Sequence, residues 1–259
     1  MAETIAVLSL KGGTGKTTTV RTLADVLRRI GLDVLAVDLD PQGNLSDYFD
    51  VPPDASPTVA DVLSGDAKVA AASHDGIVPA SPILAEVERS LSGKLGRELV
   101  LRKALKDARK QHDVILIDCP PALGLLTING LVAADWALVS SEAQYFALQG
   151  VEGALEVIEQ AKEFYNPELE WLGVVLNIAD MRTTHSRDAY AQLQQVFGDK
   201  VFTTVIRASI AYAESAEKAR SILDHRPDLG EDYLALADEV LARIGLADAR
   251  RKLEPLRTS

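Results

Sequence analysis

Six short apolar runs, separated by segments with helical spacing, dominate the pattern of this chain. They are rich in Val, Ile and Leu and cover residues 5–10, 34–38, 114–118, 137–140, 172–176 and 201–206. Because these runs do not alternate with polar residues, they are typical of strands buried on both faces. Between the first two, apolar residues recur at helical spacing from Val20 to Ile30, and Gly31 then supplies a helix stop. The repeated strand–helix–strand pattern predicts an α/β fold, a mostly parallel twisted sheet with helices on both faces.

The chain has 259 residues and contains neither an internal repeat nor a low-complexity linker. We therefore expect one domain over residues 1–259, with a loosely ordered tail at 246–259. Residues 52–82 hold five of the eleven prolines and are expected to form a surface excursion with a short helix near 59–63. The last long helix is expected at 232–244, where apolar residues gather on one side.

Charge and cysteine content narrow the class of protein. The formal net charge is −11, so any contact with DNA must come from a local basic patch rather than from the whole surface. The single cysteine, Cys119, excludes a disulfide framework, favours a reducing cytoplasm and is expected to be a packed core residue. The start of the chain lacks the basic segment of a secretory signal, and no apolar run is long enough to span a membrane. The four histidines are dispersed and predict no transition-metal site.

A glycine-rich loop lies directly between the first predicted strand and the helix that follows. Its residues are Lys11, Gly12, Gly13, Thr14, Gly15, Lys16, Thr17 and Thr18. Glycines let the backbone approach phosphate oxygens, and the loop N–H groups with the helix N-terminus stabilise an anion. Lys16 is expected to contact the β- and γ-phosphates of a nucleotide, and the hydroxyl of Thr17 suits Mg²⁺.

Carboxylates follow two of the other predicted strands. Asp38 and Asp40 stand two residues apart, which places them on the same side of a strand, and at the C-terminal end of a parallel strand that side opens on a ligand crevice. Asp118 ends the run 114–118 and precedes Cys119 and two prolines. This is a Walker B arrangement, in which Asp118 is expected to hold Mg²⁺ through water.

The glycine loop departs from the common G-x-x-x-x-G-K-[ST] pattern, because Leu10 stands where the first glycine belongs and a second lysine, Lys11, opens the loop. This deviant Walker A form resembles that of the ParA/MinD family of ATPases, and the resemblance covers residues 4–244. The segments 124–135, 145–150 and 173–177 resemble ParA/Soj partition proteins more closely than MinD.

The resemblance implies a deviant Walker A P-loop NTPase fold, with ATP and Mg²⁺ as cofactors and a slow, partner-stimulated ATPase activity. It implies a homodimer that forms with ATP, in which Lys11 reaches the partner's phosphates. Asp40 is expected to orient or activate the attacking water, and Asp38 to support the Mg²⁺ shell. Asn177 and Arg207 are expected beside the nucleotide. Arg207 replaces the proline that borders adenine in relatives, and could stack on the base or contact phosphate.

DNA binding without sequence preference is a further implication of the resemblance. Residues 89–110 hold eight basic side chains against two acidic ones, a local net charge of +6 in an acidic chain. Relatives carry two arginines within the stretch that corresponds to 206–211, and this chain has alanines in their place. Either other residues contact DNA or the surface binding is weaker or different. The candidate DNA-binding residues are Lys94, Arg102, Lys103, Lys106, Arg182, Lys218 and Arg220.

The sequence therefore indicates a cytoplasmic, nucleoid-associated ATPase that positions a chromosome, a plasmid or a protein cargo. A ParB-like protein or a cargo adaptor is expected to stimulate hydrolysis. Two other functions stay open: a MinD-like ATPase that acts at the membrane, and a nucleotide-gated adaptor without significant turnover. Membrane use is disfavoured, because residues 247–259 carry Leu253 and Leu256 but no bulky aromatic residue, and Pro255 interrupts them. The adaptor is disfavoured by the presence of both Asp40 and Asp118.

Overall fold

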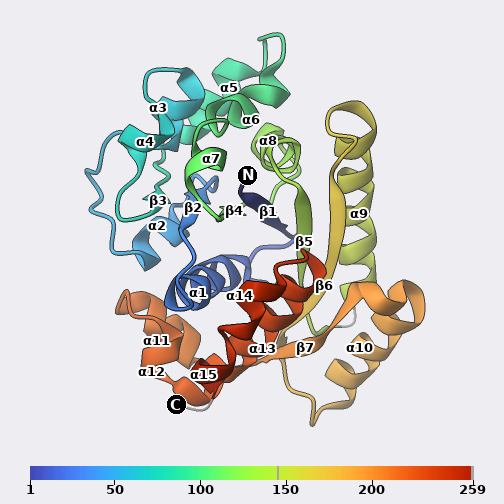
Figure 1. Ribbon diagram of the computed structural model, residues 1–259. Coiled ribbons are helices and arrows are strands. Elements are labelled where there is room, and N and C mark those ends of the chain that lie inside the picture. The colour runs from blue at the N-terminus through green and yellow to red at the C-terminus, as the bar shows by residue number, and fades with distance from the viewer. Residues whose placement is uncertain (145, 258–259) are drawn as a thin grey trace.

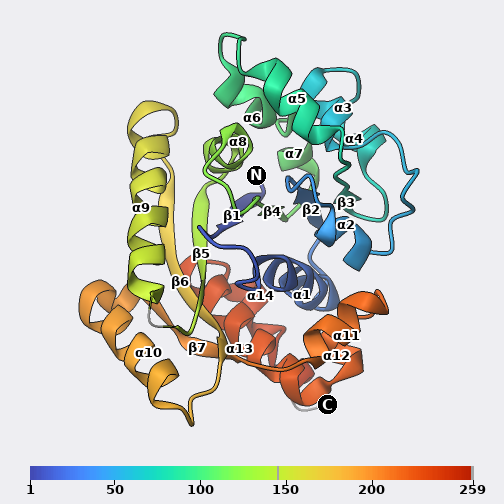
Figure 2. The ribbon, with the colours of Figure 1, turned by 180° about the vertical axis from the view of Figure 1, so that it is seen from behind.

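A computed structural model describes residues 1–144 and 146–257, and it contains one fully parallel sheet (Figures 1 and 2). Tyr145, at the start of the segment 145–150, and the last two residues of the expected loose tail lie outside this range. The order across the sheet is β3-β2-β4-β1-β5-β6-β7, and every pairing is parallel. The strands are β1 (Glu3–Leu8), β2 (Val34–Asp38), β3 (Ile77–Val78), β4 (Val114–Asp118), β5 (Trp136–Glu142), β6 (Glu170–Ala179) and β7 (Val201–Arg207). The predicted fold class is confirmed.

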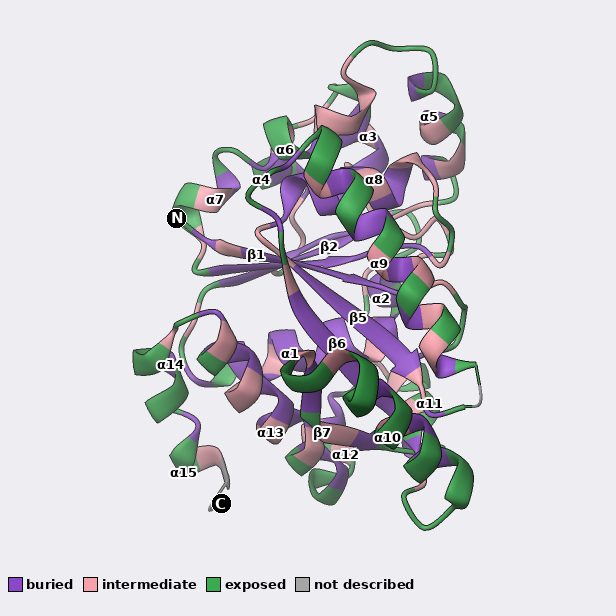
Figure 3. Ribbon diagram, turned by 90° about the vertical axis from the view of Figure 1, so that its right-hand side faces the viewer, coloured by how far each residue is buried: buried purple, intermediate pink, exposed green. Residues whose placement is uncertain are grey.

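Helices cover both faces of the sheet, which explains why the strands read as continuous apolar runs (Figure 3). One face packs against α3 (Val59–Ser64), α4 (Val69–Ala72), α5 (Leu84–Leu91), α6 (Val100–Ala104), α7 (Ala108–Gln111), α8 (Leu125–Ala133), α9 (Ala147–Phe164) and α10 (Thr184–Phe197). The other packs against α1 (Lys16–Arg29), α2 (Asn44–Tyr48), α11 (Ala211–Glu217), α12 (Ile222–His225), α13 (Pro227–Arg243) and α14 (Ala247–Arg251). Two short 3₁₀ helices, η1 (Arg97–Leu99) and η2 (Gly198–Lys200), and α15 (Glu254–Arg257) complete the described elements.

The segment 52–82 is more than the expected surface excursion. The short helix is present as α3, and its first turn is capped by the reciprocal pair of Thr58 and Asp61. The same segment also contributes α4 and the edge strand β3, which pairs with β2 through Ile77 and Val78. Both residues are buried. The sequence pattern missed this strand because two residues are too few to produce a periodic signal.

The C-terminal part of the chain is longer and better packed than expected. The last long helix, α13, begins at Pro227 rather than at residue 232, with the proline in the first turn, where its missing N–H costs nothing. The expected loose tail forms α14 and α15 as far as residue 257, and Leu253 between them is only 1 % exposed. Among the described residues, no helix combines the length and apolar character needed to cross a bilayer.

The parallel pairing brings the carboxyl ends of three strands together. Asp118 at the end of β4 lies in register with Asp38 on β2 and with Val7 on β1. The loops that follow these strands therefore start side by side at one edge of the sheet. Crevices outside the carboxyl ends of parallel strands are where open α/β sheets bind ligands.

Candidate functional site

The glycine loop leaves β1 after Leu8 and ends where α1 begins at Lys16. Gly13 and Gly15 have φ angles of +76° and +84°, in the left-handed region that side-chain-bearing residues avoid. A Cβ atom on Gly15 would also lie 3.2 Å from the Asn177 side chain. Glycine is thus required at position 15 both for its backbone angle and for the close approach of β6.

Hydroxyl groups hold the loop around the Lys16 ammonium group. The Lys16 side chain is largely buried, at 7 % exposure, and its Nζ donates to Ser9 Oγ at 3.1 Å. Thr14 Oγ1 also donates to Ser9 Oγ at 2.9 Å, and Ser9 Oγ donates to the Lys11 carbonyl at 2.7 Å. Ser9 therefore links both ends of the loop to Lys16. The Lys16 ammonium group supplies a positive charge at the N-terminus of α1.

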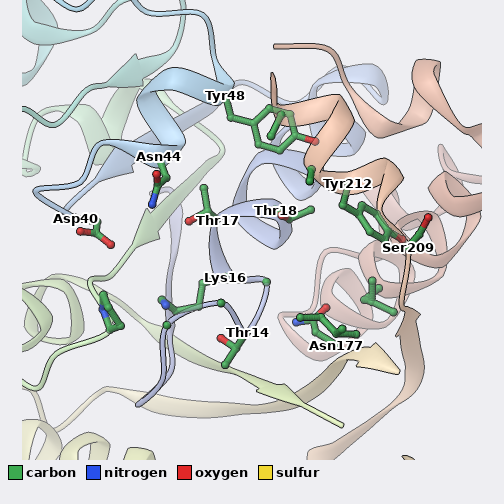
Figure 4. Close-up of a pocket in the computed structure, with 18 of the residues that line it drawn as sticks. Thr14, Lys16, Thr17, Thr18, Asp40, Asn44, Tyr48, Asn177, Ser209 and Tyr212 are labelled. Atoms are coloured by element: carbon green, nitrogen blue, oxygen red, sulfur yellow. The ribbon is translucent and has the colours of Figure 1, made fainter. Parts of the chain in front are cut away.

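A cavity of about 760 Å³ opens above the loop (Figure 4). Figure 4 shows the first residues of α1 at its base, with Asp40 on one side and Asn177 and Tyr212 on the other. The predicted residues that line it are Gly12, Gly13, Thr14, Gly15, Lys16, Thr17, Thr18, Asp40, Asn177 and Arg207. Both the size and the mixture of apolar walls with a few convergent polar groups suit a small-molecule ligand.

Three predicted carboxylates meet at the end of this cavity but lie at different depths. Thr17 Oγ1 donates to Asp118 Oδ2 at 2.7 Å, and Asp118 Oδ1 is buried without a hydrogen-bond partner among the described residues. Asp38 is fully buried behind the cavity and accepts hydrogen bonds from the backbone N–H groups of Asp40 and Ser46 and from the Ser46 hydroxyl. Asp40 lines the cavity, and its carboxylate accepts from Gln42 N–H at 3.0 Å.

The prediction that the Asp38 and Asp40 side chains face the same side is wrong, and the reason is local. The strand β2 ends at Asp38, so the alternation of side chains no longer governs Asp40. The turn that follows is held by Asp38 itself through the Asp40 N–H, which turns the Asp40 side chain toward the cavity while Asp38 stays inside. Asp38 therefore positions the loop that carries Asp40.

Burial changes the acidity of the two inner carboxyl groups. Desolvation raises the pKa of Asp118 to about 8, with a further contribution from the charge of Asp38, while the Thr17 hydrogen bond and the Lys16 charge act in the opposite direction. Desolvation also raises the pKa of Asp38 to about 6, against the hydrogen bonds from Ser46 and Asp40. Without a cation, the pair therefore holds one proton at neutral pH, mainly on Asp118.

The donor set around Asp118 fits a small, hard divalent cation such as Mg²⁺. Its unpartnered carboxylate oxygen and the adjacent Thr17 hydroxyl are both oxygen ligands, which Mg²⁺ prefers. Among the described residues, no group of three or more His, Cys, Asp or Glu side chains could hold a metal on its own. A cation here would complete its shell with water and with oxygens of a bound ligand, as Mg²⁺ commonly does.

We predict that raising the pH from about 5 to about 8 destabilises the cation-free protein. The folded state binds more protons than the unfolded state over this range, because both carboxyl groups titrate above the unfolded value of about 4, so the free energy of unfolding falls as the pH rises. The expected loss is about 5 kcal/mol, or about 10–20 °C in the midpoint of thermal unfolding. Circular dichroism melts measure it, and Asp118→Asn should flatten the profile; an equally steep fall in that variant would contradict the assignment.

Lys11, the second lysine of the loop, faces away from the cavity of its own chain. It is exposed and is not among the residues that line the cavity. Its Nζ lies 5.5 Å from the centre of the Phe146 ring, over which it makes a cation–π contact. The two loop lysines, five residues apart, thus differ in orientation: Lys16 points inward and Lys11 outward.

Asn177 and Arg207 lie at the far end of the cavity. Asn177 Nδ2 donates to Ser140 Oγ at 2.7 Å, and Ser140 Oγ donates to the Thr14 carbonyl at 2.7 Å, so Asn177 supports the glycine loop from below. Its Oδ1 is buried without a hydrogen-bond partner in the described part of the chain. Arg207 lies at the rim, where its Nε pairs with Asp232 at 2.9 Å and its guanidinium also contacts the Asp228 carbonyl.

Sequence reasoning missed an aromatic wall of the cavity. Tyr48 on α2, Tyr212 on α11 and Tyr233 on α13 all line it, and the Tyr212 and Tyr233 rings meet edge to face with centroids 6.0 Å apart. Tyr48 Oη is hydrogen-bonded to Ser215 Oγ, which joins α2 to α11 across the cavity. No motif marks these residues, because they come from three helices that only the fold brings together.

The residues expected to bind DNA do not form one patch on a single chain. Lys94, Arg102, Lys103 and Lys106 lie on the segment around α6 and α7, at one end of the molecule in Figure 1, whereas Arg182 precedes α10 and Lys218 and Arg220 follow α11 at the other end. Arg182 pairs with Asp180 at 2.8 Å. Some basic side chains of residues 89–110 are also neutralised by acidic neighbours. Arg97 pairs with Glu98, Arg109 with Asp135 and Lys110 with Asp107.

Cys119 is the packed core residue that the sequence predicts. It is completely buried between β4 and α8, where a Cβ on Gly130 would clash with its Sγ. Burial raises the pKa of its thiol far above the usual range, so it is not an available nucleophile.

Comparison with known proteins places this geometry among nucleotide-dependent proteins. The AAA domain family matches residues 2–171. The chain is 39% identical to the chromosome-partitioning ATPase Soj of Thermus thermophilus, covering 93% of this chain and 96% of that protein. It resembles the crystal structure of cobyrinic acid a,c-diamide synthase from Mycobacterium smegmatis with bound ADP and magnesium, at TM-score 0.76 and 37% identity over 87% of this chain and 95% of that one. The structure of apo McdA from Cyanothece matches at TM-score 0.84 and 25% identity, covering 93% and 100% of the two chains.

Proposed function

This chain belongs to the ParA/Soj-type partition ATPases within the AAA domain family, and we propose that it is an ATP-driven switch that dimerises, binds DNA and positions a cargo. The cargo is a chromosome, a plasmid or a protein assembly. The observation that carries the proposal is the orientation of Lys11, which lies outside the cavity of its own chain. A loop lysine in that position can reach a phosphate only on a second chain that faces it.

In the proposed dimer, Lys11 of each chain supplies positive charge to the nucleotide of the other. Charge that develops on the transferred phosphoryl group is stabilised by such a cation, as it is by an arginine finger. Dimer formation then depends on the triphosphate, because the γ-phosphate is the group that Lys11 contacts. Hydrolysis removes this contact and lets the two chains separate.

The cavity residues perform the other steps of hydrolysis in this proposal. The loop N–H groups and Lys16 bind the β- and γ-phosphates. Thr17 and Asp118 would hold Mg²⁺, with Asp38 behind them, and the cation would supply Lewis-acid neutralisation of phosphate charge. Asp40 orients or activates the attacking water from the opposite wall. At the far end, Asn177 and Arg207 flank the nucleobase.

DNA binding is proposed to require two chains rather than one. Arg182, Lys218 and Arg220 lie at one end of the molecule and Arg102 and Lys106 at the other, so a single chain offers only small separate patches. Pairing two chains doubles the number of phosphate contacts, and affinity for DNA rises steeply with that number. Lys94 and Lys103 belong to the same basic segment but also line a second cavity.

A partner protein is proposed to complete the cycle. A ParB-like protein or a cargo adaptor would stimulate hydrolysis on the nucleoid, in the cytoplasm, so that the dimer releases DNA where the cargo lies. Of the two rival functions, membrane attachment is disfavoured by the burial of Leu253 in the tail. The adaptor without turnover is disfavoured by the presence of both Asp40 and Asp118 at the cavity.

We predict that Lys11→Ala separates ATP binding from dimerisation. The variant should bind ATP about as tightly as the parent, because Lys11 lies outside its own cavity. In analytical ultracentrifugation with ATP, the parent should sediment as a dimer and the variant as a single chain. In anisotropy titrations the ATP-bound parent should bind a short DNA duplex with an affinity that falls steeply as salt rises. The affinity of the variant for the same duplex should be lower by about tenfold or more.

The nucleotide provides the control for this experiment. The parent with ADP should behave as the variant does with ATP. A parent that remains a single chain with every nucleotide would refute the proposed switch, and binding to anionic lipid vesicles in place of DNA would favour the membrane-acting alternative.

A further inference from the structure

A second cavity of about 800 Å³ is lined by residues of α3, α4, α6 and α7. Figure 2 shows these helices at the end of the molecule away from α11 and α12. We call this cavity the lysine groove. Its lining includes four lysines, Lys68, Lys94, Lys103 and Lys110. No residue of the glycine loop or of the nucleotide cavity contributes to it.

The floor of the lysine groove is apolar. Val62 and Leu63 come from α3, Val69 from α4 and Leu91 from α5, while Val100 and Ala104 of α6 form the opposite wall. Leu95 follows Lys94 in the loop between α5 and η1, and its side chain is fully exposed. An apolar surface with an exposed leucine beside it is typical of a protein-binding site.

The rim of the lysine groove is positively charged. Within the described residues, Lys68, Lys94 and Lys103 make no ion pair, whereas Lys110 pairs with Asp107 at 3.0 Å. Lys103 of α6 and Lys110 of α7 line the groove together with Asp107 of the turn between the two helices, whereas Arg102 and Lys106 do not line it. A group of lysines around an apolar floor suits a partner of the opposite charge.

We propose that the lysine groove binds an amphipathic, acidic helix of a partner protein. A helix about 10 Å wide that rises about 5.4 Å per turn fills about 420 Å³ per turn, so the groove accommodates about two turns. Apolar side chains at i, i+3, i+4 and i+7 would enter the groove, and flanking Asp or Glu residues would pair with its lysines. DNA fits less well, because a phosphate backbone offers nothing to cover the apolar floor.

Hydrogen bonds join two helices of the groove to α8. Glu88 of α5 accepts from the Leu126 N–H at the start of α8 at 3.2 Å. The Leu101 N–H of α6 donates to the side chain of Asn129, also on α8, at 3.1 Å. Helix α8 follows the Asp118 loop, so an occupant resting on α5 and α6 would lie on helices that are bonded to the element next to that loop. The docking itself does not depend on the proposed function.

The test uses the full chain without nucleotide and a designed, fluorescently labelled peptide of about 16 residues, with leucines at i, i+3, i+4 and i+7 and glutamates on the other face. Anisotropy should show binding that weakens as salt rises. Lys103→Glu should weaken it about tenfold, and Lys68→Glu, on the opposite wall, should do the same. Lys106→Glu is the matched control, because it makes the same charge change in the adjoining turn at a residue that does not line the groove, and it should weaken binding by less than about threefold.

Three further probes decide between occupants. A peptide with serines in place of the leucines should not bind, and equal binding by that peptide would overturn the proposal. An equal loss of leucine-peptide affinity in Lys103→Glu and Lys106→Glu would also overturn it. Binding of a short DNA duplex that Lys68→Glu abolishes, with no binding of the leucine peptide, would assign the groove to DNA instead. Self-association of the protein alone that Lys103→Glu removes would make the groove an interface between copies.

Discussion

Replacing Asp40 by alanine should lower the steady-state rate of ATP hydrolysis by about 100-fold or more while leaving ATP binding intact. The Asp40 carboxylate lines the nucleotide cavity, and in the described part of the chain it accepts one hydrogen bond, from the Gln42 N–H, so it has room to accept another from water. Loss of a group that orients or deprotonates the nucleophile typically costs two to four orders of magnitude, about 3–5 kcal/mol. Phosphate release measures the rate, and calorimetry with ATP measures the affinity.

Asp47 provides the matched control for Asp40. It is also an exposed carboxylate that lines the cavity, but it lies on α2, beyond the turn held by Asp38. Asp47→Ala should change the rate by less than about threefold. Parental turnover by Asp40→Ala would remove Asp40 from the catalytic role. The ATP-bound dimer should survive in Asp40→Ala, because Lys11 and the phosphates are unchanged.

Replacing Lys16 by alanine should weaken ATP and ADP binding by about 100-fold or more. The Lys16 ammonium is almost buried at the N-terminus of α1, with Ser9 Oγ at 3.1 Å as its polar contact. Its charge is therefore little screened by solvent, and a phosphate in the cavity would pair with it directly. Isothermal titration calorimetry with each nucleotide measures the loss.

Lys11→Ala serves as the control for Lys16→Ala, since it makes the same change in the same loop. Because Lys11 faces away from the cavity, the affinity of a single chain for ADP should stay within about threefold of the parent. Comparable loss of ADP binding in both variants would mean that Lys11 acts within its own chain. That result would also remove the basis for the proposed dimer.

Most of the sheet could be predicted from the sequence, because strands buried on both faces leave a strong apolar signal. The runs 34–38 and 114–118 coincide with β2 and β4. The first run was placed two residues late, since β1 ends at Leu8 and Leu10 belongs to the loop. The edge strand β3 gave no signal, because its burial comes from pairing with β2 and from helices distant in sequence.

The candidate site, like the sheet, contains parts that the sequence predicts and parts that it does not. The loop 11–18 and Asp118 were predicted because they are contiguous with the elements that position them. The tyrosine wall formed by Tyr48, Tyr212 and Tyr233 was not, because its members come from separate helices. The basic segment around α6 was recognised by its charge, but its division into a groove-lining face and an outer face follows from the packing of α3 and α4 against it.

The strand–loop–helix unit and the carboxylates after the strands can be predicted from the order of residues, because they depend on neighbours a few residues away and on the rule that parallel strands end at one edge. The directions of the charged side chains follow from the packed fold: Asp40 lines the cavity with Asp38 behind it, and Lys16 points inward while Lys11 points outward. The direction of a side chain at the end of a strand is set by long-range packing and by the hydrogen bonds of the following turn. Neither long-range packing nor the hydrogen bonds of a turn produces a periodic pattern in the sequence.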